Sequence, residues 1–226
     1  MEGPFLDPGV PDAEETAYRG TIGGSPAGHG THRIAATGEA YEQSLDMTIL
    51  DEASYSATIS WRRSDGHITA ERYSLEASHR GRPVSSESGW FRGVKALHWG
   101  GALEPYPRDL SPLLGCALAL RGLEFRRGAR RSLSVWLAST VYWEIETRVE
   151  KVEEVALPGL GPLPAWRVRA RPHFGHVAGA LDRLVALVLP PFVLHFDADA
   201  PHRFLRFEFP TGPFPWNPRG VIEATG

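Results

Sequence analysis

Apolar and polar residues alternate with a period of two through long parts of the chain, and this alternation predicts β-strands. In residues 141–150, Val141, Trp143, Ile145, Thr147 and Val149 fall on one face, whereas mostly charged side chains fall on the other. The same rhythm runs through residues 165–171 and through residues 39–79, where turn signals separate the segments. One apolar and one polar face per strand is typical of an antiparallel sheet with one solvated side.

Two segments depart from this rhythm and predict helices. Residues 175–189 place Val177, Leu181, Leu184 and Val188 at helical spacing, and Pro190 with Pro191 ends the pattern. A shorter helix is expected over residues 111–120, with Asp109 or Ser111 as its N-cap. After the longer helix, residues 192–197 and 203–209 read as a closing β-hairpin.

Many strands, few helices and no strand–helix alternation predict a mainly β protein. We expect one curved antiparallel sheet or half-open β-barrel, wrapped around one or two helices on its concave side. Residues 1–30 are rich in Pro and Gly and show little periodicity, so we interpret them as a flexible arm that contributes little to folding. Residues 31–226 then form a single half-barrel domain, with the helix at about 175–189 as an insertion.

Composition narrows the possible partners and compartments. The 226 residues carry a formal net charge of −3, so no basic surface is expected to attract nucleic acid. A single cysteine, Cys116, excludes an intrachain disulfide and fits a reducing compartment. Neither a secretory signal nor an uninterrupted membrane span is recognisable, and we therefore expect a cytoplasmic protein.

Several stretches together resemble the bacterial domain of unknown function 3108, whose members look like the lipoprotein-carrier (LolA/LolB-like) half-barrels. They are VSSESGWFRGVKALHWGG, DLSPLLGCALALRGLEFRRGARRSLSVWLAS, VEKVEEVALPGLGPLPAWRVRA and LPPFVLHFDADAPHRFLRFEF. The resemblance implies a half-open antiparallel barrel around a helix, with an apolar cavity and no particular reaction. This chain departs from it in lacking an export signal and in the helix at 175–189, which could plug the cavity or form a lid over it.

One cluster of residues suggests a metal site. His195, Asp197 and Asp199 alternate along an expected strand, and His202 follows three residues later. Such side chains are ligands for zinc, iron or manganese. However, the sequence DADAPH is also typical of a polar hairpin turn, because Asp bonds nearby backbone and Pro cannot lie in a central strand. We favour the hairpin, and predict neither a metal nor another cofactor.

The other chemical candidates are weaker. The pairs His29/His32 and His173/His176 lack nearby acidic partners in the sequence. Glu144 and Glu146 could act as an acid–base pair, but their neighbours Arg148, Glu150 and Lys151 indicate a solvated, salt-bridged face, with Arg167 or Arg169 across the sheet. Cys116 lies in an apolar segment and reads as an inert thiol.

Large aromatic side chains are the most informative feature for function. They either fill the core or line a cavity in a sheet that is too large to fill its own interior. The expected ligand-binding residues are Trp90, His98, Trp99, Tyr106, Trp136, Trp143 and Trp166. The first hypothesis is binding of an apolar, lipid-like or polycyclic small molecule. The alternatives are an isomerase- or cyclase-type enzyme using one or two polar residues in the same cavity, and a structural or interaction domain with a filled core.

Overall fold

The protein is built on one large β-sheet. The computed structural model describes residues 5–92, 95–98, 101–103, 109–138, 141–173, 190–212, 214 and 216–226. The strands are β1 (Phe5–Leu6), β2 (Ala13–Ile22), β3 (Ser25–Thr37), β4 (Ala40–Ile49), β5 (Ala53–Ser64), β6 (His67–His79), β7 (Arg82–Arg92), β8 (Lys95–His98), β9 (Gly101–Leu103), β10 (Leu110–Pro112), β11 (Arg130–Ala138), β12 (Val141–Leu157), β13 (Gly161–His173), β14 (Phe192–Asp197), β15 (Phe204–Pro210) and β16 (Arg219–Thr225).

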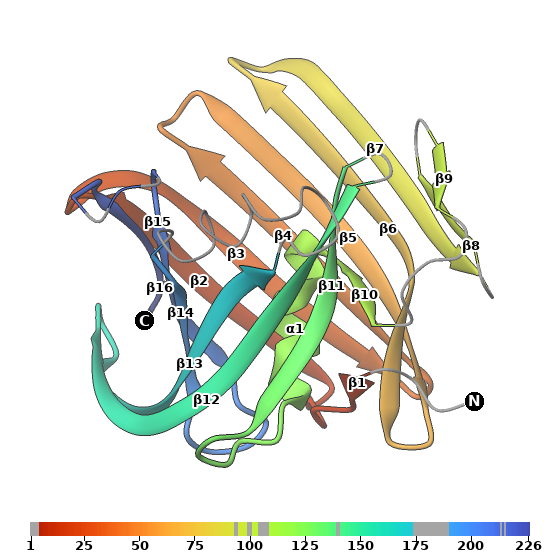
Figure 1. The fold of residues 1–226 in the computed structure, drawn as a ribbon. Coiled ribbons are helices and arrows are strands. Elements are labelled where there is room, and N and C mark those ends of the chain that lie inside the picture. The colour runs from red at the N-terminus through yellow and green to blue at the C-terminus, as the bar shows by residue number, and fades with distance from the viewer. Residues whose placement is uncertain are drawn as a thin grey trace.

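The sheet is curved and does not close, as the sequence predicted. Its strand order is β10-β11-β12-β13-β14-β15-β16-β2-β3-β4-β5-β6-β7-β8-β9, and β1 pairs with β6 beside this path. All neighbouring strands are antiparallel except β10 and β11. Figure 1 shows the strands curling around the short helix α1 (Cys116–Ala119), which lies inside the curve. The mainly β, half-open architecture is therefore confirmed.

The expectation of a flexible arm is wrong for residues 13–30, which form β2 and the first part of β3. β2 pairs with β16 on one side and with β3 on the other, so these residues join the two halves of the sheet. The glycines that suggested a loose arm have a structural role, because a Cβ on Gly30 would lie 2.6 Å from the backbone oxygen of Asp46. Strands β3 and β4 approach too closely there for a side chain, and glycine is the residue that permits such an approach.

Residues 113–122 fill part of the concave side. The expected helix over residues 111–120 is three short helical turns: η1 (Leu113–Gly115), α1 and η2 (Leu120–Gly122), preceded by β10. Leu118 is fully buried, and Gly115 lies against Trp61, where a Cβ would come within 2.7 Å of the indole ring. This segment packs on the inner residues of the sheet and forms the main core.

The predicted helix at 175–189 lies outside the described residues. Strands β13 and β14, which precede and follow it in the chain, pair directly with each other. No helix among the residues that the structure describes is long and apolar enough to cross a lipid bilayer.

Candidate ligand-binding site

The concave face contains an apolar pocket of about 270 Å³. The residues that line it come from β4, β5, β6 and β7, from the end of β10 and from the start of η1. They are Met47, Ile49, Tyr55, Ala57, Ile59, Tyr73, Ser74, Leu75, Glu87, Pro112 and Leu113. Met47 of β4 is paired with Tyr55 on the neighbouring strand β5, and Ala57 of β5 is paired with Leu75 on β6. We call this the inner pocket.

Residues 113–122, which we call the filling segment, cover only part of the concave face, and the inner pocket lies beside the end of this segment. Deeper along the same strands, Tyr41 and Trp61 are fully buried, and Trp61 lies against Gly115 of residues 113–122. Towards the β4–β5 turn, Met47, Ile49 and Leu75 are only partly buried, Tyr55 is 37% exposed and Leu113 is 53% exposed. The sheet is thus wider than the segment that packs on it, and apolar side chains are left accessible to a ligand.

A buried polar chain crosses the core beside the pocket. The Nε2 atom of Gln43 donates to Nε2 of His32 at 2.9 Å, and Oε1 of Gln43 accepts from Nε1 of Trp61 at 2.9 Å. His32 is 4% exposed, and its burial lowers its pKa to about 4. His32 therefore serves as a neutral hydrogen-bond acceptor at neutral pH.

This buried histidine should make stability depend on pH. The pKa of His32 is lowered from 6.5 on folding, so the unfolded chain binds the proton more tightly and stability falls as the pH decreases from about 6.5 to about 4. We expect His32 to contribute a loss of about 3 kcal/mol over that range. Chemical unfolding at several pH values should show a flatter profile for His32→Gln, which keeps an acceptor for Gln43.

The profile of His79→Gln, at an exposed position, should parallel that of the unmodified protein. The pKa of His195 is also lowered by burial, so His32 is isolated as the difference between the protein and its His32→Gln variant. Identical slopes for these two proteins would contradict the assignment.

A second buried polar contact ties the filling segment to the sheet. Both terminal nitrogens of Arg121 donate to the carboxylate of Glu14 in β2, at 2.8 and 2.9 Å, and its Nε donates to the backbone oxygen of Pro201 at 2.8 Å. Arg121 is only 2% exposed.

In α1, burial raises the pKa of the Cys116 thiol to about 12, which agrees with the inert thiol predicted from the sequence.

The residues of the proposed metal cluster form a hairpin instead. The backbone N–H of Asp197 donates to the oxygen of Arg203, and that of His202 donates to the oxygen of Asp199, so the turn begins where β14 ends. Asp199 caps the turn by donating its N–H to Oδ1 of Asp197 at 3.3 Å. The alternation therefore stops at Asp197, and the hairpin interpretation is confirmed. Within the described ranges, no three His, Cys, Asp or Glu side chains gather as a metal site.

His195 has a role that the sequence did not reveal. Its side chain is 4% exposed, and Nε2 donates to Oε1 of Glu153 at 2.9 Å. Burial raises the pKa of Glu153, but hydrogen bonds from Lys151 and His195 and the charge of Arg167 outweigh it and lower that pKa to about 2. The glutamate thus stays charged and holds three cationic or polar partners together.

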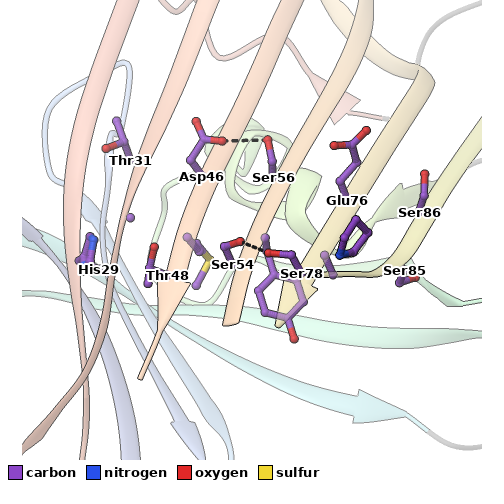
Figure 2. A pocket seen from close by; sticks show the side chains of 15 residues that line it. His29, Thr31, Asp46, Thr48, Ser54, Ser56, Glu76, Ser78, Ser85 and Ser86 are labelled. Carbon is purple, nitrogen blue, oxygen red and sulfur yellow. Dashed lines mark hydrogen bonds between the residues drawn. The ribbon is translucent and has the colours of Figure 1, made fainter. Parts of the chain in front are cut away.

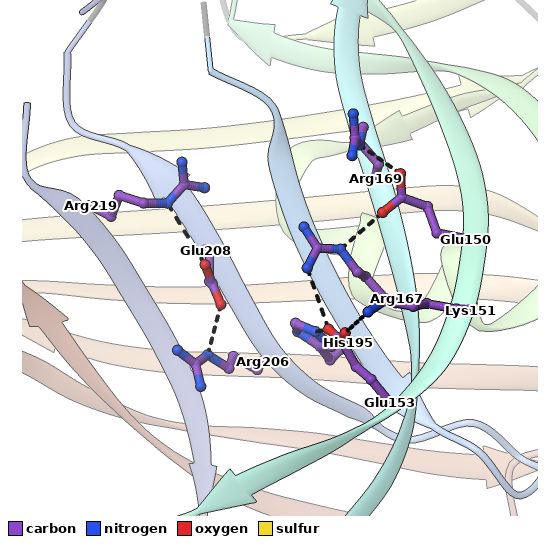
Figure 3. Close-up of polar contacts among 9 residues, drawn as sticks. All are labelled: Glu150, Lys151, Glu153, Arg167, Arg169, His195, Arg206, Glu208 and Arg219. Atoms are coloured by element: carbon purple, nitrogen blue, oxygen red, sulfur yellow. Dashed lines mark hydrogen bonds and ion pairs between the residues drawn. The ribbon is translucent and has the colours of Figure 1, made fainter. Parts of the chain in front are cut away.

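This pair belongs to an ionic network on the outer face of the sheet. Figure 3 shows Glu150 between Arg167 and Arg169, with nitrogen–oxygen distances of 2.9 and 2.8 Å. Further along the sheet, Glu208 pairs with Arg206 at 3.2 Å. The expected salt bridges from β13 are therefore present, but they run to Glu150 and Glu153. Glu146 instead pairs with Arg130 at 3.2 Å.

Three of the predicted aromatic residues have described side chains, and these lie outside the inner pocket. Trp143 and Trp166 lie on the inner face, and Trp166 packs on Phe125 with ring centroids 6.2 Å apart. Trp90 is 38% exposed and points away from its buried neighbour Phe91. Trp99 and Tyr106 lie outside the described residues, as do the side chains of His98 and Trp136. Of the seven, the three whose side chains the structure describes, Trp90, Trp143 and Trp166, do not line the inner pocket.

The outer face of β3–β7 carries a second hollow, of about 610 Å³, which we call the outer groove. Figure 2 shows polar side chains converging on it from five strands: His29, Thr31, Asp46, Thr48, Ser54, Ser56, Glu76, Ser78, Ser85 and Ser86. His29 and His32 thus point to opposite faces of β3 and do not form a pair. His173 ends β13, and its side chain and His176 lie outside the described residues. The alternation of Ser54, Ser56, Thr58 and Ser60 in the sequence was the available signal for this polar face.

Comparison with known proteins identifies the fold. No family model and no curated protein matches the sequence. A β-barrel-like protein of the domain of unknown function DUF1849 from Brucella abortus aligns over 93% of this chain and 94% of its own, with a TM-score of 0.53 and 8% identity. A putative lipoprotein from Parabacteroides distasonis aligns over 99% of this chain and 98% of its own, with 7% identity, but its TM-score of 0.32 supports no inference.

The resemblance drawn from the sequence is therefore supported at the level of the fold alone, and domain 3108 and the lipoprotein carriers are not singled out. At 8% identity the likeness shows shape rather than activity, and this chain shares the β-barrel-like fold of the Brucella abortus domain of unknown function.

Proposed function

We propose that this protein binds an apolar small molecule in its inner pocket. The observation that carries the proposal is the row of partly exposed apolar side chains on the concave face: Met47, Ile49, Tyr55, Leu75 and Leu113. Burying such side chains against a ligand is favourable, because removing apolar surface from water lowers the free energy by about 25 cal/mol per Å². The sheet behind them is held by backbone hydrogen bonds, so the pocket is largely preformed.

The size and lining of the pocket favour a slender or small-ring ligand. About 270 Å³ lies just below the usual range of small-molecule sites, and the pocket is open on one side. Leu113 and Pro112 form one wall, and Glu87, the register partner of Leu75, supplies a polar group in a mostly apolar lining. A lipid-like acyl chain or a small polycyclic compound with one polar end fits this chemistry, and an acyl chain would agree with the expected similarity to lipoprotein carriers.

Binding is favoured over the two alternatives. An isomerase- or cyclase-type enzyme would place an acid–base pair against its substrate. The described lining holds one carboxylate, Glu87, but no second carboxylate and no histidine to pair with it, and the buried His32 is engaged with Gln43 outside the pocket. A purely structural domain would have a filled interior, whereas the described concave face leaves apolar side chains exposed.

A neutral fluorescent probe tests the proposal. N-phenyl-1-naphthylamine should bind saturably and become brighter, and Leu113→Asp should weaken its binding about tenfold, because a carboxylate in an apolar wall must be desolvated. Leu113 is half exposed, so the substitution should leave the fold intact, which circular dichroism would verify.

Val84→Asp is the matched control, because Val84 is 64% exposed on β7 and does not line the pocket. Its probe affinity should equal that of the unmodified protein. Absence of saturable probe binding, or equal losses in the two variants, would refute the inner pocket as a ligand site.

A further inference from the structure

The outer groove is organised as two rows of polar side chains that cross the strands. Thr31, Asp46, Ser56, Glu76 and Ser86 are successive register partners on β3, β4, β5, β6 and β7. A second row, two residues further along each strand, contains His29, Thr48, Ser54 and Ser78. Neighbouring positions in a row are separated by the strand spacing of about 4.8 Å.

The floor of the groove is ordered by its own hydrogen bonds. The hydroxyls of Ser54 and Ser78 are 2.6 Å apart, and the hydroxyl of Ser56 donates to Oδ1 of Asp46 at 2.8 Å. The other carboxylate oxygen of Asp46 accepts from Arg33 at 3.2 Å. Short hydroxyl side chains leave the centre of the face hollow, and these contacts fix where their donors and acceptors point (Figure 2).

We propose that the outer groove binds an oligosaccharide that lies across the strands. The lining combines hydroxyls, two carboxylates and one imidazole, which supply donors and acceptors, with the apolar surfaces of Met47, Tyr55, Ala77 and Pro83. This mixture matches a sugar, whose ring presents hydroxyls around its edge and C–H groups on its faces. Sugar rings are about as wide as the strand spacing of about 4.8 Å, so consecutive rings can meet consecutive strands. The hollow of about 610 Å³ has room for several rings.

The charges of the groove select among sugars. Among its described lining residues are Asp46 and Glu76 but no lysine or arginine. Arg33 reaches Asp46 from the edge and already has that carboxylate and Glu15 as partners. A carboxylated sugar would meet like charges, so neutral or amino-bearing sugars are the expected ligands. The polar side chains of this site lie on the opposite face from the inner pocket, although Met47 and Tyr55 line both hollows at the end of the sheet.

The test is calorimetric titration of the full chain with β-1,4-linked tetramers of glucose, of glucosamine and of glucuronic acid, which share one backbone and differ in charge. At least one of the first two should bind saturably, and the acidic tetramer should bind more weakly than that one. The Ser54→Val/Ser56→Val variant removes two floor hydroxyls at exposed strand positions that tolerate valine. It should weaken binding by about tenfold or more.

The control is Thr58→Val/Ser60→Val, which makes the same chemical change on the same face of β5, outside the groove. This variant should bind the tetramers as the unmodified protein does. Three outcomes would overturn the proposal: no saturable binding of the glucose or glucosamine tetramer, equal losses in both double variants, or preferential binding of the acidic tetramer.

Discussion

Replacing Arg121 with alanine should lower the free energy of unfolding by about 3 to 5 kcal/mol, because it leaves the carboxylate of Glu14 without its buried partner. The guanidinium group is 1% exposed and makes three hydrogen bonds, one of them to the hairpin that follows β14. This one side chain therefore links the filling segment 113–122 to β2 and to residue 201. Denaturant unfolding measures this loss of stability, provided that the free energy of unfolding of the two proteins depends on denaturant concentration with the same slope.

Two further variants separate the buried pair from a general effect of removing arginine. Arg126→Ala removes an exposed pair with Glu124 and should leave the free energy of unfolding nearly unchanged, because solvent screens such pairs. Arg121→Met/Glu14→Leu removes both charges, and should be more stable than Arg121→Ala although it lacks one more polar group. A small effect of Arg121→Ala, similar to that of Arg126→Ala, would contradict this role.

A chain that begins at residue 32 should fail to unfold cooperatively. Removing residues 1–31 deletes β2 and the first half of β3, and exposes the backbone edges of β16 and β4 in the middle of the sheet. It also removes Glu14, the partner of Arg121, and Tyr18, whose hydroxyl donates to the backbone oxygen of Phe204 at 2.7 Å. The free-energy cost of the unpaired backbone groups and of the lost burial together exceeds the usual free energy of unfolding of a domain.

Complementation distinguishes a missing strand from an unrelated defect. A peptide of residues 1–31 added in trans should restore a cooperative transition, since it can pair with both exposed edges. Cooperative melting of the shortened chain within a few degrees of the full protein would show that β2 is dispensable, contrary to its central place in the sheet.

The candidate sites were only partly predictable. An apolar site on the concave face was expected from seven residues, of which the three with described side chains, Trp90, Trp143 and Trp166, do not line the inner pocket. Met47, Leu75 and Leu113 gave no distinct signal, because each is an ordinary apolar residue of its own strand or turn. They meet through the register of β4 with β5 and of β5 with β6, and through the path of the chain after β10. The partnership of His195 with Glu153 likewise depends on a contact between residues that are 42 positions apart.

Local pattern determined strands β4, β5 and β6, the strands of the second half of the chain and the polar hairpin at Asp197, because burial on one face of a strand imposes a period of two on the sequence itself. In β12, Thr147 and Val149 are buried and Glu146 and Arg148 are exposed, as the alternation predicts. In β2 and β3 few large apolar residues mark the buried face, and glycines are present because a neighbouring strand approaches closely. Only the tertiary structure decided that these residues are central, that residues 113–122 leave part of the concave face open, and that hydroxyls from five strands share one groove. Each of these features depends on pairing between segments that are distant in sequence, and such pairing leaves no periodic mark on either segment alone.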